Sequence, residues 1–285
     1  RAVTLRAREC GYNGSHVSIG RVQTPLLGLI VQRDLEIENF KPVEYFAISA
    51  EVAVPKGEFR AQWRPRKGQS GLDEEGRLLD RSVAEALKKR VTGKTGKIVE
   101  YEDEERQEGP LLPYSVDRLQ VLASRKYGYK PDAVLGALQA LYEEHGLTTY
   151  PRSDCQYLPV AQLADAPEVL RAIGQNTDLV DDQINAQLDP NRKSRAWNDQ
   201  KVTAHHAIIP TTKRANIDAL PKIQRDLYHE VCKAYIAQFM PPHRYRSVSA
   251  TVEVEGEHFR ATGRTTIAPG WRVLFGAQER DAKEE

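Results

Sequence analysis

The pattern of apolar and polar positions divides the chain into four blocks that alternate between helical and β character. In the first block, residues 1–40, a run that begins at Thr24 has Pro25 in its first turn, where proline is tolerated in a helix. Its apolar side chains recur at helical spacing, at Leu26, Leu27, Ile30, Val31 and Leu35. This block therefore predicts an amphipathic helix over about residues 24–38.

The second block, residues 41–105, has the alternation typical of strands. Two such runs flank the turn sequence Pro55-Lys56-Gly57 and predict a β-hairpin. The expected elements are hairpin strands at 46–54 and 58–63, a short helix at 80–90 and a strand near 96–100. The acidic run that follows, residues 100–108, predicts a solvated linker.

The third block, residues 106–240, is helical. From Pro131 onward, the apolar positions form a continuous stripe, and Gly146 is expected to stop this helix. The stripe consists of Val134, Leu135, Leu138, Leu141 and Tyr142. Further helices are expected to begin near Ser115 and to span about 221–239.

The fourth block, residues 241–285, returns to strand periodicity and predicts a second hairpin at 247–254 and 258–263. A lone hairpin is only marginally stable in water, so we expect the two hairpins to share one sheet. The predicted fold class is α+β. A discontinuous β-rich domain, built from 41–105 and 241–285, would carry the helical domain 106–240 as an insertion.

Composition narrows the class of protein. The chain has 285 residues, and 40% of them are apolar, which is enough to build a core. It contains no apolar run long enough to span a membrane, and Arg6, Arg8 and Glu9 stand where a signal peptide would be apolar. The three cysteines are far apart and form no C-x-x-C pair, which argues against a disulfide framework or zinc ribbon and favours a reducing, cytoplasmic setting.

Charge gives a mixed signal about nucleic acid. The formal net charge is only +1, which argues against a general polyanion binder. Residues 191–215, however, are locally basic, because Asp199 is the one acidic residue among them. Their cations are Arg192, Lys193, Arg195, Lys201, Lys213 and Arg214.

The stretch after Gly146 holds the strongest candidate chemistry. Pro151 favours an extended backbone at Tyr150, so Tyr150 and Arg152 point to the same side. A free phenol has a pKa of about 10 and needs help to act as a nucleophile, and a nearby guanidinium favours the phenolate and binds phosphate oxygens. The pair therefore fits phosphoryl transfer. The alternative is a tyrosine packed at a helix–loop junction beside a surface arginine.

Two other stretches could contribute to such a site. Adjacent His205 and His206 do not share a face, so they are poor joint metal ligands, but one of them could stabilise charge on a phosphate. The turn Ser18–Pro25 could present Arg21, Gln23 and the amides of a helix N-terminus to a phosphate. It lacks the G-K-[ST] of a P-loop. An ordinary solvated loop and an ordinary helix start remain the alternatives.

Other chemistries are weaker. Cys155 with either histidine would make a thiol hydrolase, but the local sequence matches no thiol-enzyme motif, and a buried inert cysteine is commoner. The carboxylate pairs Glu36/Glu38 and Asp181/Asp182 could be metal ligands. A solvated helix face for the first pair and a linker for the second explain these acids better.

Taken together, these stretches resemble the type IA DNA topoisomerases, and most of all their bacterial topoisomerase III group. The resemblance covers nearly the whole chain, and its most specific part is the pair Tyr-Pro-Arg-Ser-Asp (150–154) and His-His-Ala-Ile-Ile-Pro-Thr (205–211). The matching segments are Ser18–Pro25 with 33–40, Leu119-Gln120, 141–143 with 147–155, 204–211 and Gly270-Trp271.

The resemblance implies a mechanism and a set of roles. Tyr150 would attack a single-stranded DNA phosphodiester and form a 5′-phosphotyrosyl link that is later resealed without ATP, after another strand has passed. Arg152 would position the scissile phosphate, and His205 would support the transition state. The implied DNA contacts are Arg21, Gln23, Thr24, Ser153, Lys201 and His206. Residues 1–40 would belong to a DNA-gripping domain, and the β-rich domain would be an arch that lifts the tyrosine-bearing helical domain.

The sequence also departs from the family pattern. The family uses Mg²⁺ bound by a Toprim domain, and no acidic D-x-D cluster replaces that domain here. We therefore expect a central fragment of a monomeric, cytoplasmic, nucleoid-associated bacterial enzyme, inactive without the Toprim domain. Two alternatives remain: a passive single-strand-binding module, and a tyrosine recombinase, which would instead leave a 3′-phosphotyrosine.

Overall fold

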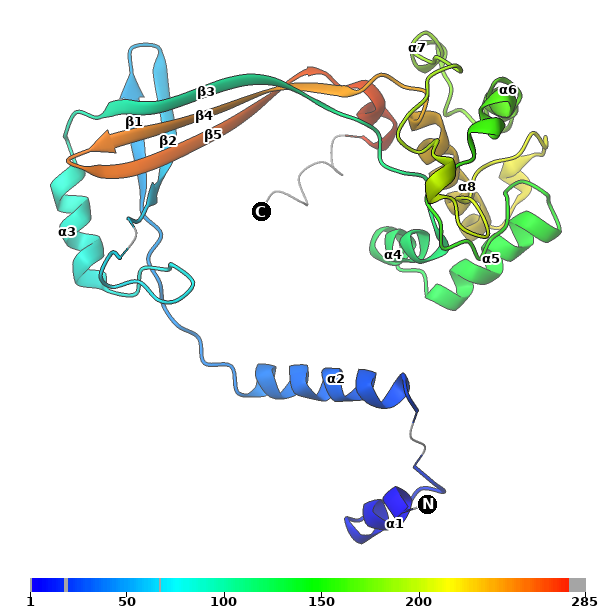
Figure 1. Cartoon of the computed structure of the whole chain (residues 1–285), viewed down its shortest axis with the longest axis horizontal. Helices are drawn as coiled ribbons and strands as arrows, with labels where there is room; N and C mark the ends of the chain where they lie inside the picture. The colour runs from blue at the N-terminus through cyan, green and yellow to red at the C-terminus, as the bar shows by residue number, and fades with distance from the viewer. Residues whose placement is uncertain (1, 18–19, 67, 277–285) are drawn as a thin grey trace. The chain divides into compact units, whose positions relative to one another are not determined.

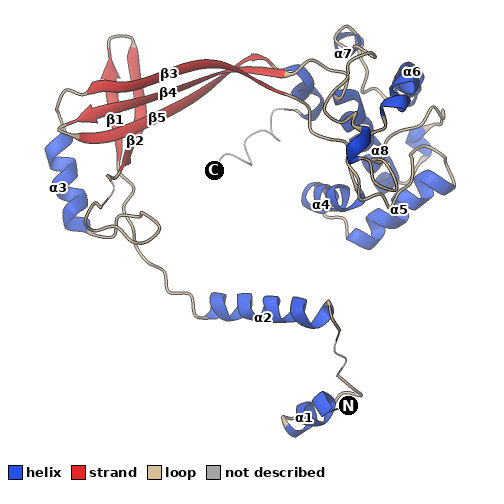
Figure 2. Ribbon diagram, in the orientation of Figure 1, coloured by secondary structure: helices blue, strands red, loops and turns tan. Residues whose placement is uncertain are grey.

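The computed structural model describes residues 2–17, 20–66 and 68–276 and has the expected α+β composition (Figures 1 and 2). The chain divides into two compact units. The first unit holds the residues up to Gly96 together with Glu253–Phe259, and the second holds Lys97–Val252 together with the residues from Arg260 onward. The domain boundaries expected from the sequence stay a prediction.

The first unit contains the predicted N-terminal helix and the first hairpin. Its elements are α1 (Ala2–Glu9), α2 (Gln23–Glu38), β1 (Ser49–Val54), β2 (Gly57–Arg64) and α3 (Arg81–Val91). Antiparallel pairing from Ser49↔Gln62 to Val54↔Gly57 confirms the hairpin, and α3 confirms the short helix. Ser18 and Ile19, at the start of the predicted phosphate-binding turn, lie outside the described residues.

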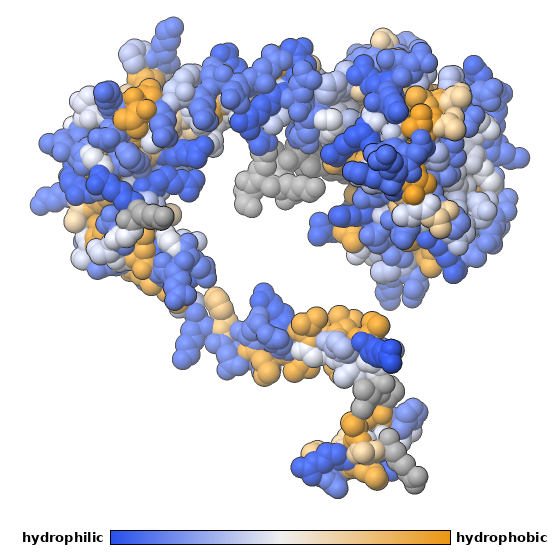
Figure 3. Space-filling model, viewed as in Figure 1, coloured by the Kyte–Doolittle hydropathy of each residue, from blue (hydrophilic) through white to orange (hydrophobic). Residues whose placement is uncertain are grey.

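Helix α2 differs from the expectation in one respect. The predicted apolar stripe is present, but no residue of α2 is buried, and hydrophobic side chains lie along its surface (Figure 3). Leu26, Ile30 and Leu35, for example, are each at least half exposed. The periodicity correctly predicts a helix with an apolar stripe, but the described residues supply no partner that buries it.

A buried carboxylate joins three segments of the first unit. Glu257, which is 5% exposed, accepts a hydrogen bond from the indole Nε1 of Trp63 at 2.9 Å and pairs with the guanidinium of Arg90. Trp63 lies on β2 and Arg90 on α3, whereas Glu257 comes from the turn end of the second hairpin. This interaction explains why Glu253–Phe259 group with the first unit.

The two hairpins share one five-stranded sheet, as predicted, with the strand order β1-β2-β5-β4-β3. The remaining strands are β3 (Lys97–Glu108), β4 (His243–Val254) and β5 (Glu257–Ala268). The expected linker at 100–108 is therefore wrong, because this run is part of the edge strand β3. An edge strand rich in acids resists pairing with other chains.

Cross-strand contacts explain how so acidic a run forms a strand. Both carboxylate oxygens of Asp103 accept hydrogen bonds from Arg246 on β4, each at 2.6 Å. Further β3–β4 contacts join Glu105 to Arg244, Glu102 to Ser249 and Glu100 to Thr251. Partners opposite one another across a ladder stabilise the pairing.

The helical part of the second unit packs around helix α8. Its α-helices are α4 (Val116–Tyr127), α5 (Pro131–Glu143), α6 (Ala166–Asn176), α7 (Asp182–Asn185) and α8 (Lys222–Ala237). Four 3₁₀ helices complete the described elements: η1 (Val160–Asp165), η2 (Asp199–Lys201), η3 (Ile217–Ala219) and η4 (Gly270–Phe275). None of the helices in the described ranges is both long and apolar enough to cross a membrane.

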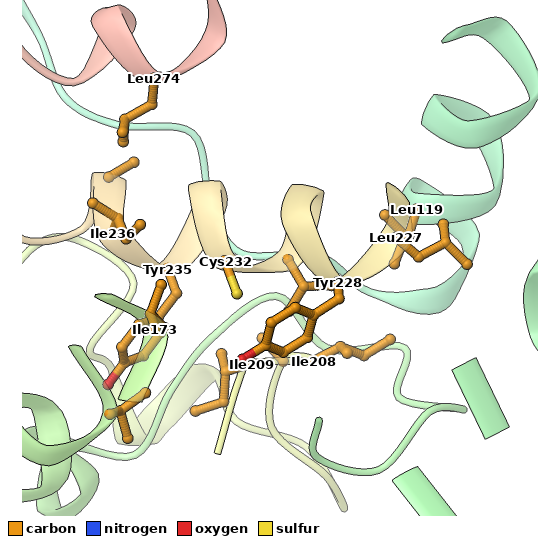
Figure 4. Packing of buried hydrophobic residues seen from close by; sticks show 14 of the residues in the cluster. Leu119, Ile173, Ile208, Ile209, Leu227, Tyr228, Cys232, Tyr235, Ile236 and Leu274 are labelled. Atoms are coloured by element: carbon orange, nitrogen blue, oxygen red, sulfur yellow. The ribbon is translucent and has the colours of Figure 1, made fainter. Parts of the chain in front are cut away.

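The core of this part confirms the predicted helical stripes. Val134, Leu138 and Leu141 of α5 are fully buried, and Tyr228 and Cys232 of α8 pack near Ile208 (Figure 4). Burial raises the pKa of the Cys232 thiol, which suits an inert packing residue. The core therefore fixes α8 against the segment that follows the histidine pair.

We predict that Glu257→Ala destabilises the first unit by about 1–3 kcal/mol, because it leaves the buried Trp63 N–H without an acceptor. Amide hydrogen exchange across α3 measures the change. Glu255→Ala on the same hairpin turn is the matched control, since Glu255 makes only an exposed ion pair with Lys94. Equal effects of the two substitutions would contradict the role given to Glu257.

We also predict an acid-sensitive step in β3. A hydrogen bond from the Arg246 side chain holds the pKa of Asp103 below its ordinary value of 3.8. Such a group stabilises the fold at pH above that ordinary value, and the contribution is lost as pH falls through the lowered pKa. The protection factors of β3 amides, which are exchange rates corrected for the intrinsic rate at each pH, should fall as pH drops from 6 through that range, and Asp103→Asn should abolish this step. An unchanged acid dependence in the variant would show that Asp103 is not responsible.

Candidate active site

Two segments far apart in the sequence pair beside the candidate tyrosine. Thr148 and Pro210 form an antiparallel bridge. Thr149 N–H donates to Ile209 O at 2.9 Å, and Thr211 N–H donates to Leu147 O at 3.0 Å. These bonds place Tyr150 at the end of one paired segment and the two histidines just before the other.

The side chain of Thr149 strengthens this pairing. Its Oγ1 accepts from Ile209 N–H at 3.0 Å and donates to Ala207 O at 3.2 Å. One hydroxyl therefore satisfies two backbone groups of the opposite segment.

Tyr150 is partly exposed and lies between two other rings. It is 36% exposed, and its ring centroid lies 4.2 Å from that of His205, with 31° between the ring planes. Tyr142, at the end of α5, contacts it edge-on at 6.0 Å. These contacts use the face and the edge of the Tyr150 ring. Within the described ranges, no side chain hydrogen-bonds that oxygen or the ring nitrogens of His205.

Arg152 is exposed on the same segment. Its guanidinium donates to Gln139 Oε1 at 3.3 Å, and Gln139 in turn donates to Glu143 at 3.1 Å. The described residues give Arg152 no carboxylate partner closer than Gln139, so its positive charge is not neutralised by direct contact. The structure thus brings Tyr150, Arg152 and His205 into one unit, with Arg152 following Tyr150 by two residues.

His206 is placed differently from His205. It is half-buried, its Nδ1 lies 2.8 Å from Ala207 O, and its Nε2 lies 3.0 Å from Gln162 Nε2. Both ring nitrogens are therefore used inside the protein. In this structure, neither ring nitrogen of His206 is left to make the predicted contact with DNA.

Ser153 also differs from the expectation. Its side chain is fully buried, and its Oγ accepts from Cys155 N–H at 3.2 Å. Its carbonyl accepts from Val116 N–H at the start of α4. The hydroxyl of Ser153 is therefore buried and used by the turn after Arg152, and its predicted contact with DNA stays a prediction.

The other predicted contacts are accessible. Lys201 is exposed, with its Nζ 3.4 Å from Tyr157 Oη and over the Tyr157 ring. Arg21, Gln23 and Thr24 are exposed at the start of α2 in the first unit, where Gly20 N–H donates to Thr24 Oγ1 at 3.1 Å.

The weaker chemistries find little support. Cys155 is buried, and its Sγ contacts the backbone of Tyr157 and Lys201 rather than a histidine ring. Within the described ranges, no three side chains of the His, Cys, Asp or Glu type are grouped so that they could hold a metal ion.

Sequence reasoning missed three residues that support the site. Tyr142 was counted only as part of a core stripe, and Thr149 and Gln162 were given no role. For Tyr142, the available signal was its place at the end of the stripe, one turn before the Gly146 stop. The contacts of Thr149 and Gln162 connect segments far apart in sequence, so no local pattern could reveal them.

Comparison with known proteins decides the family. A family model described as DNA topoisomerase matches residues 1–285, the whole chain. The chain belongs to the DNA topoisomerase family. This membership confirms the resemblance seen in the motifs around Tyr150 and His205.

Related topoisomerases extend well beyond this sequence. DNA topoisomerase 3 of Pasteurella multocida is 41% identical over 302 residues, which cover all of this chain and 46% of the relative. DNA topoisomerase 3 of Vibrio cholerae is 40% identical, with 44% of its length covered. The chain thus spans a little under half the length of these relatives.

A solved topoisomerase shares the fold. The structure of full-length topoisomerase I from Thermotoga maritima matches with a TM-score of 0.63 at 21% identity, covering 92% of this chain and 41% of the other. At this level of identity, the likeness supports the α+β fold of this topoisomerase family member.

We predict that Thr149→Val loosens the candidate site. Valine keeps the shape of threonine but removes the hydroxyl that Ile209 N–H and Ala207 O share, at a cost of about 1–3 kcal/mol. Amide exchange of α8 and the nuclear Overhauser effect (NOE) between the Tyr150 and His205 rings measure the change. Thr212→Val, at an exposed position nearby, should shift stability by less than about 0.5 kcal/mol. Full retention of the ring contact in Thr149→Val would count against the pairing described above.

Proposed function

We propose that this chain is the part of a type IA topoisomerase that carries the nucleophile, and that it acts on single-stranded DNA. The observation that supports this most directly is the partly exposed Tyr150 ring against His205, on the same segment as an arginine that has no carboxylate partner among the described residues. These are the groups that attack on a phosphodiester requires: a nucleophile, a donor and a cation.

The proposed reaction exchanges one ester for another. The Tyr150 oxygen attacks phosphorus and loses its proton, a Tyr–O–P bond forms, and the P–O3′ bond breaks. The 3′ oxygen takes up a proton and leaves as a free hydroxyl, while the protein stays attached to the 5′ phosphate. Attack by the 3′ hydroxyl on the phosphotyrosine reverses the step and reseals the strand, so no ATP is consumed.

Each neighbouring group has a proposed role that its placement permits. Arg152 binds non-bridging oxygens of the scissile phosphate, because it is exposed and its described partner is a neutral amide. His205 presents ring nitrogens that are not hydrogen-bonded within the described ranges and stabilises the charge that develops on the phosphate. Lys201, Arg21, Gln23 and Thr24 contact the strand farther along.

Mg²⁺, which the family resemblance implies, does not fit the described residues, since they hold no cluster of three potential ligands. We propose that it is bound by the Toprim domain that the resemblance implies, and no step above is assigned to it. We also propose that the whole enzyme acts as a monomer in the bacterial cytoplasm, on DNA of the nucleoid.

We predict that the isolated chain does not relax supercoiled DNA even with Mg²⁺. The chain should regain activity when it replaces the matching region of the Pasteurella multocida relative, and Tyr150→Phe should abolish that activity. Agarose gels of plasmid topoisomers measure the change, and end-mapping of denatured complexes identifies the DNA end that carries protein.

Each part of this proposal has an outcome that would contradict it. Relaxation by the isolated chain that Tyr150→Phe abolishes would overturn the expected inactivity. A 3′-linked adduct would instead indicate recombinase-type chemistry. If the chimera forms no covalent adduct and Tyr150→Phe leaves its affinity for DNA unchanged, only passive binding to DNA would remain.

A further inference from the structure

We infer that His206 is a positioning residue that holds the Tyr150–His205 pair together, rather than a group that contacts DNA. The inference concerns a residue of the proposed active site and therefore rests on the proposed function for its biological meaning. The contacts that support it lie within the second unit, and they can be measured without DNA.

The first step is the protonation pattern of the His206 ring. Nδ1 lies 2.8 Å from Ala207 O, and a carbonyl oxygen can only accept, so Nδ1 must carry a proton. In a neutral ring, Nε2 then lacks a proton and accepts from the Gln162 amide at 3.0 Å. The two contacts together select one tautomer and fix the plane of the ring.

The second step is the acceptor that His206 shares with Thr149. Ala207 O accepts from His206 Nδ1 and also from Thr149 Oγ1 at 3.2 Å, so both of its lone pairs are used. Thr149 Oγ1 itself accepts from Ile209 N–H. A continuous chain of hydrogen bonds therefore runs from Gln162 on η1 through His206 to Thr149, the residue directly before Tyr150.

The third step is the position of His206 directly after His205. With the His206 ring fixed at both nitrogens, the backbone at this point is held, and the ring of the neighbouring His205 lies 4.2 Å from the Tyr150 ring. This chain of hydrogen bonds, which we call the clamp, therefore acts on the backbone next to both Tyr150 and His205. Gln162, Thr149 and Ile209 also line one surface depression of about 350 Å³.

The tautomer is the first test. In the chain labelled with ¹⁵N-histidine, long-range ¹H–¹⁵N correlation spectra at pH 7.5 should show a protonated Nδ1 and an unprotonated Nε2 for His206. A ring protonated only at Nε2, or an imidazolium at this pH, would overturn the inference.

Substitutions then test the positioning role. His206→Phe keeps a ring but removes both hydrogen bonds, so the NOE between the Tyr150 and His205 rings should fall at least twofold. His206→Asn, whose amide can still donate to Ala207 O, should retain more of it. Gln162→Leu should weaken the NOE in the otherwise wild-type chain. In a chain that already carries His206→Phe, it should cause no further loss of the NOE. An undiminished NOE in both His206 variants, or additive effects of the two positions, would contradict the clamp.

DNA binding separates positioning from direct contact. For a single-stranded oligonucleotide, His206→Asn should leave the dependence of log affinity on log salt unchanged, whereas Lys201→Ala should reduce its slope by about 0.7, the value for one phosphate contact. An equal reduction in His206→Asn would make His206 a phosphate ligand and overturn the inference. If the wild-type chain binds no DNA, the proposed function fails, while the tautomer and the ring contact still decide the role of His206.

Discussion

The short antiparallel pairing between residues 146–149 and 207–211 is the constraint on which the rest of the candidate site depends. It joins Thr149 to Ile209 across sixty residues, so the entropy of closing a long loop opposes it. The pairing persists because the segment that includes Ile208 and Ile209 is buried against α8, where the core of the helical unit lies. The hydrogen bonds set the register, and the core stabilises the pairing. Tyr150 and His205 meet because each lies just beyond it, so their proximity follows from the fold of the whole helical unit.

Local patterns in the sequence predicted most elements of this unit, since helical periodicity depends on neighbours three or four residues apart. Val134, Leu138 and Leu141 of the predicted stripe are buried, whereas Tyr142 at its end is exposed, and the second hairpin pairs with the first in one sheet. Tyr150, Arg152 and His205 were identified by motif, but the ring contact between Tyr150 and His205 was beyond a local pattern. The same limit applies to Ser153 and His206. Both belong to motifs that point to DNA, yet their polar atoms are used by groups whose position only the fold determines.

Strand β3 and helix α2 show the limits of a sequence pattern when the segment that pairs with an element, or covers it, is not known. The acids of β3 suggested a solvated linker, because the arginines that pair with them lie on β4; Asp103 and Arg246 are 143 residues apart. In α2, the predicted apolar stripe is present, and its side chains are exposed among the described residues. A sequence pattern predicts which face an element presents, whereas the partner of that face depends on contacts distant in the chain.

The distribution of cation partners gives the near-zero net charge a different meaning. On β4, Arg244 and Arg246 are matched by carboxylates of β3, so their charges stabilise the sheet and are unavailable to a polyanion. Beside Tyr150, by contrast, the described partner of Arg152 is an amide, and that of Lys201 is a phenol. Neutral partners hold a cation in place without cancelling its charge, and a phosphate can replace them at little electrostatic cost. A net charge of +1 is therefore compatible with cations near Tyr150 that keep their charge, because part of the acidic residues is paired with arginines of the sheet.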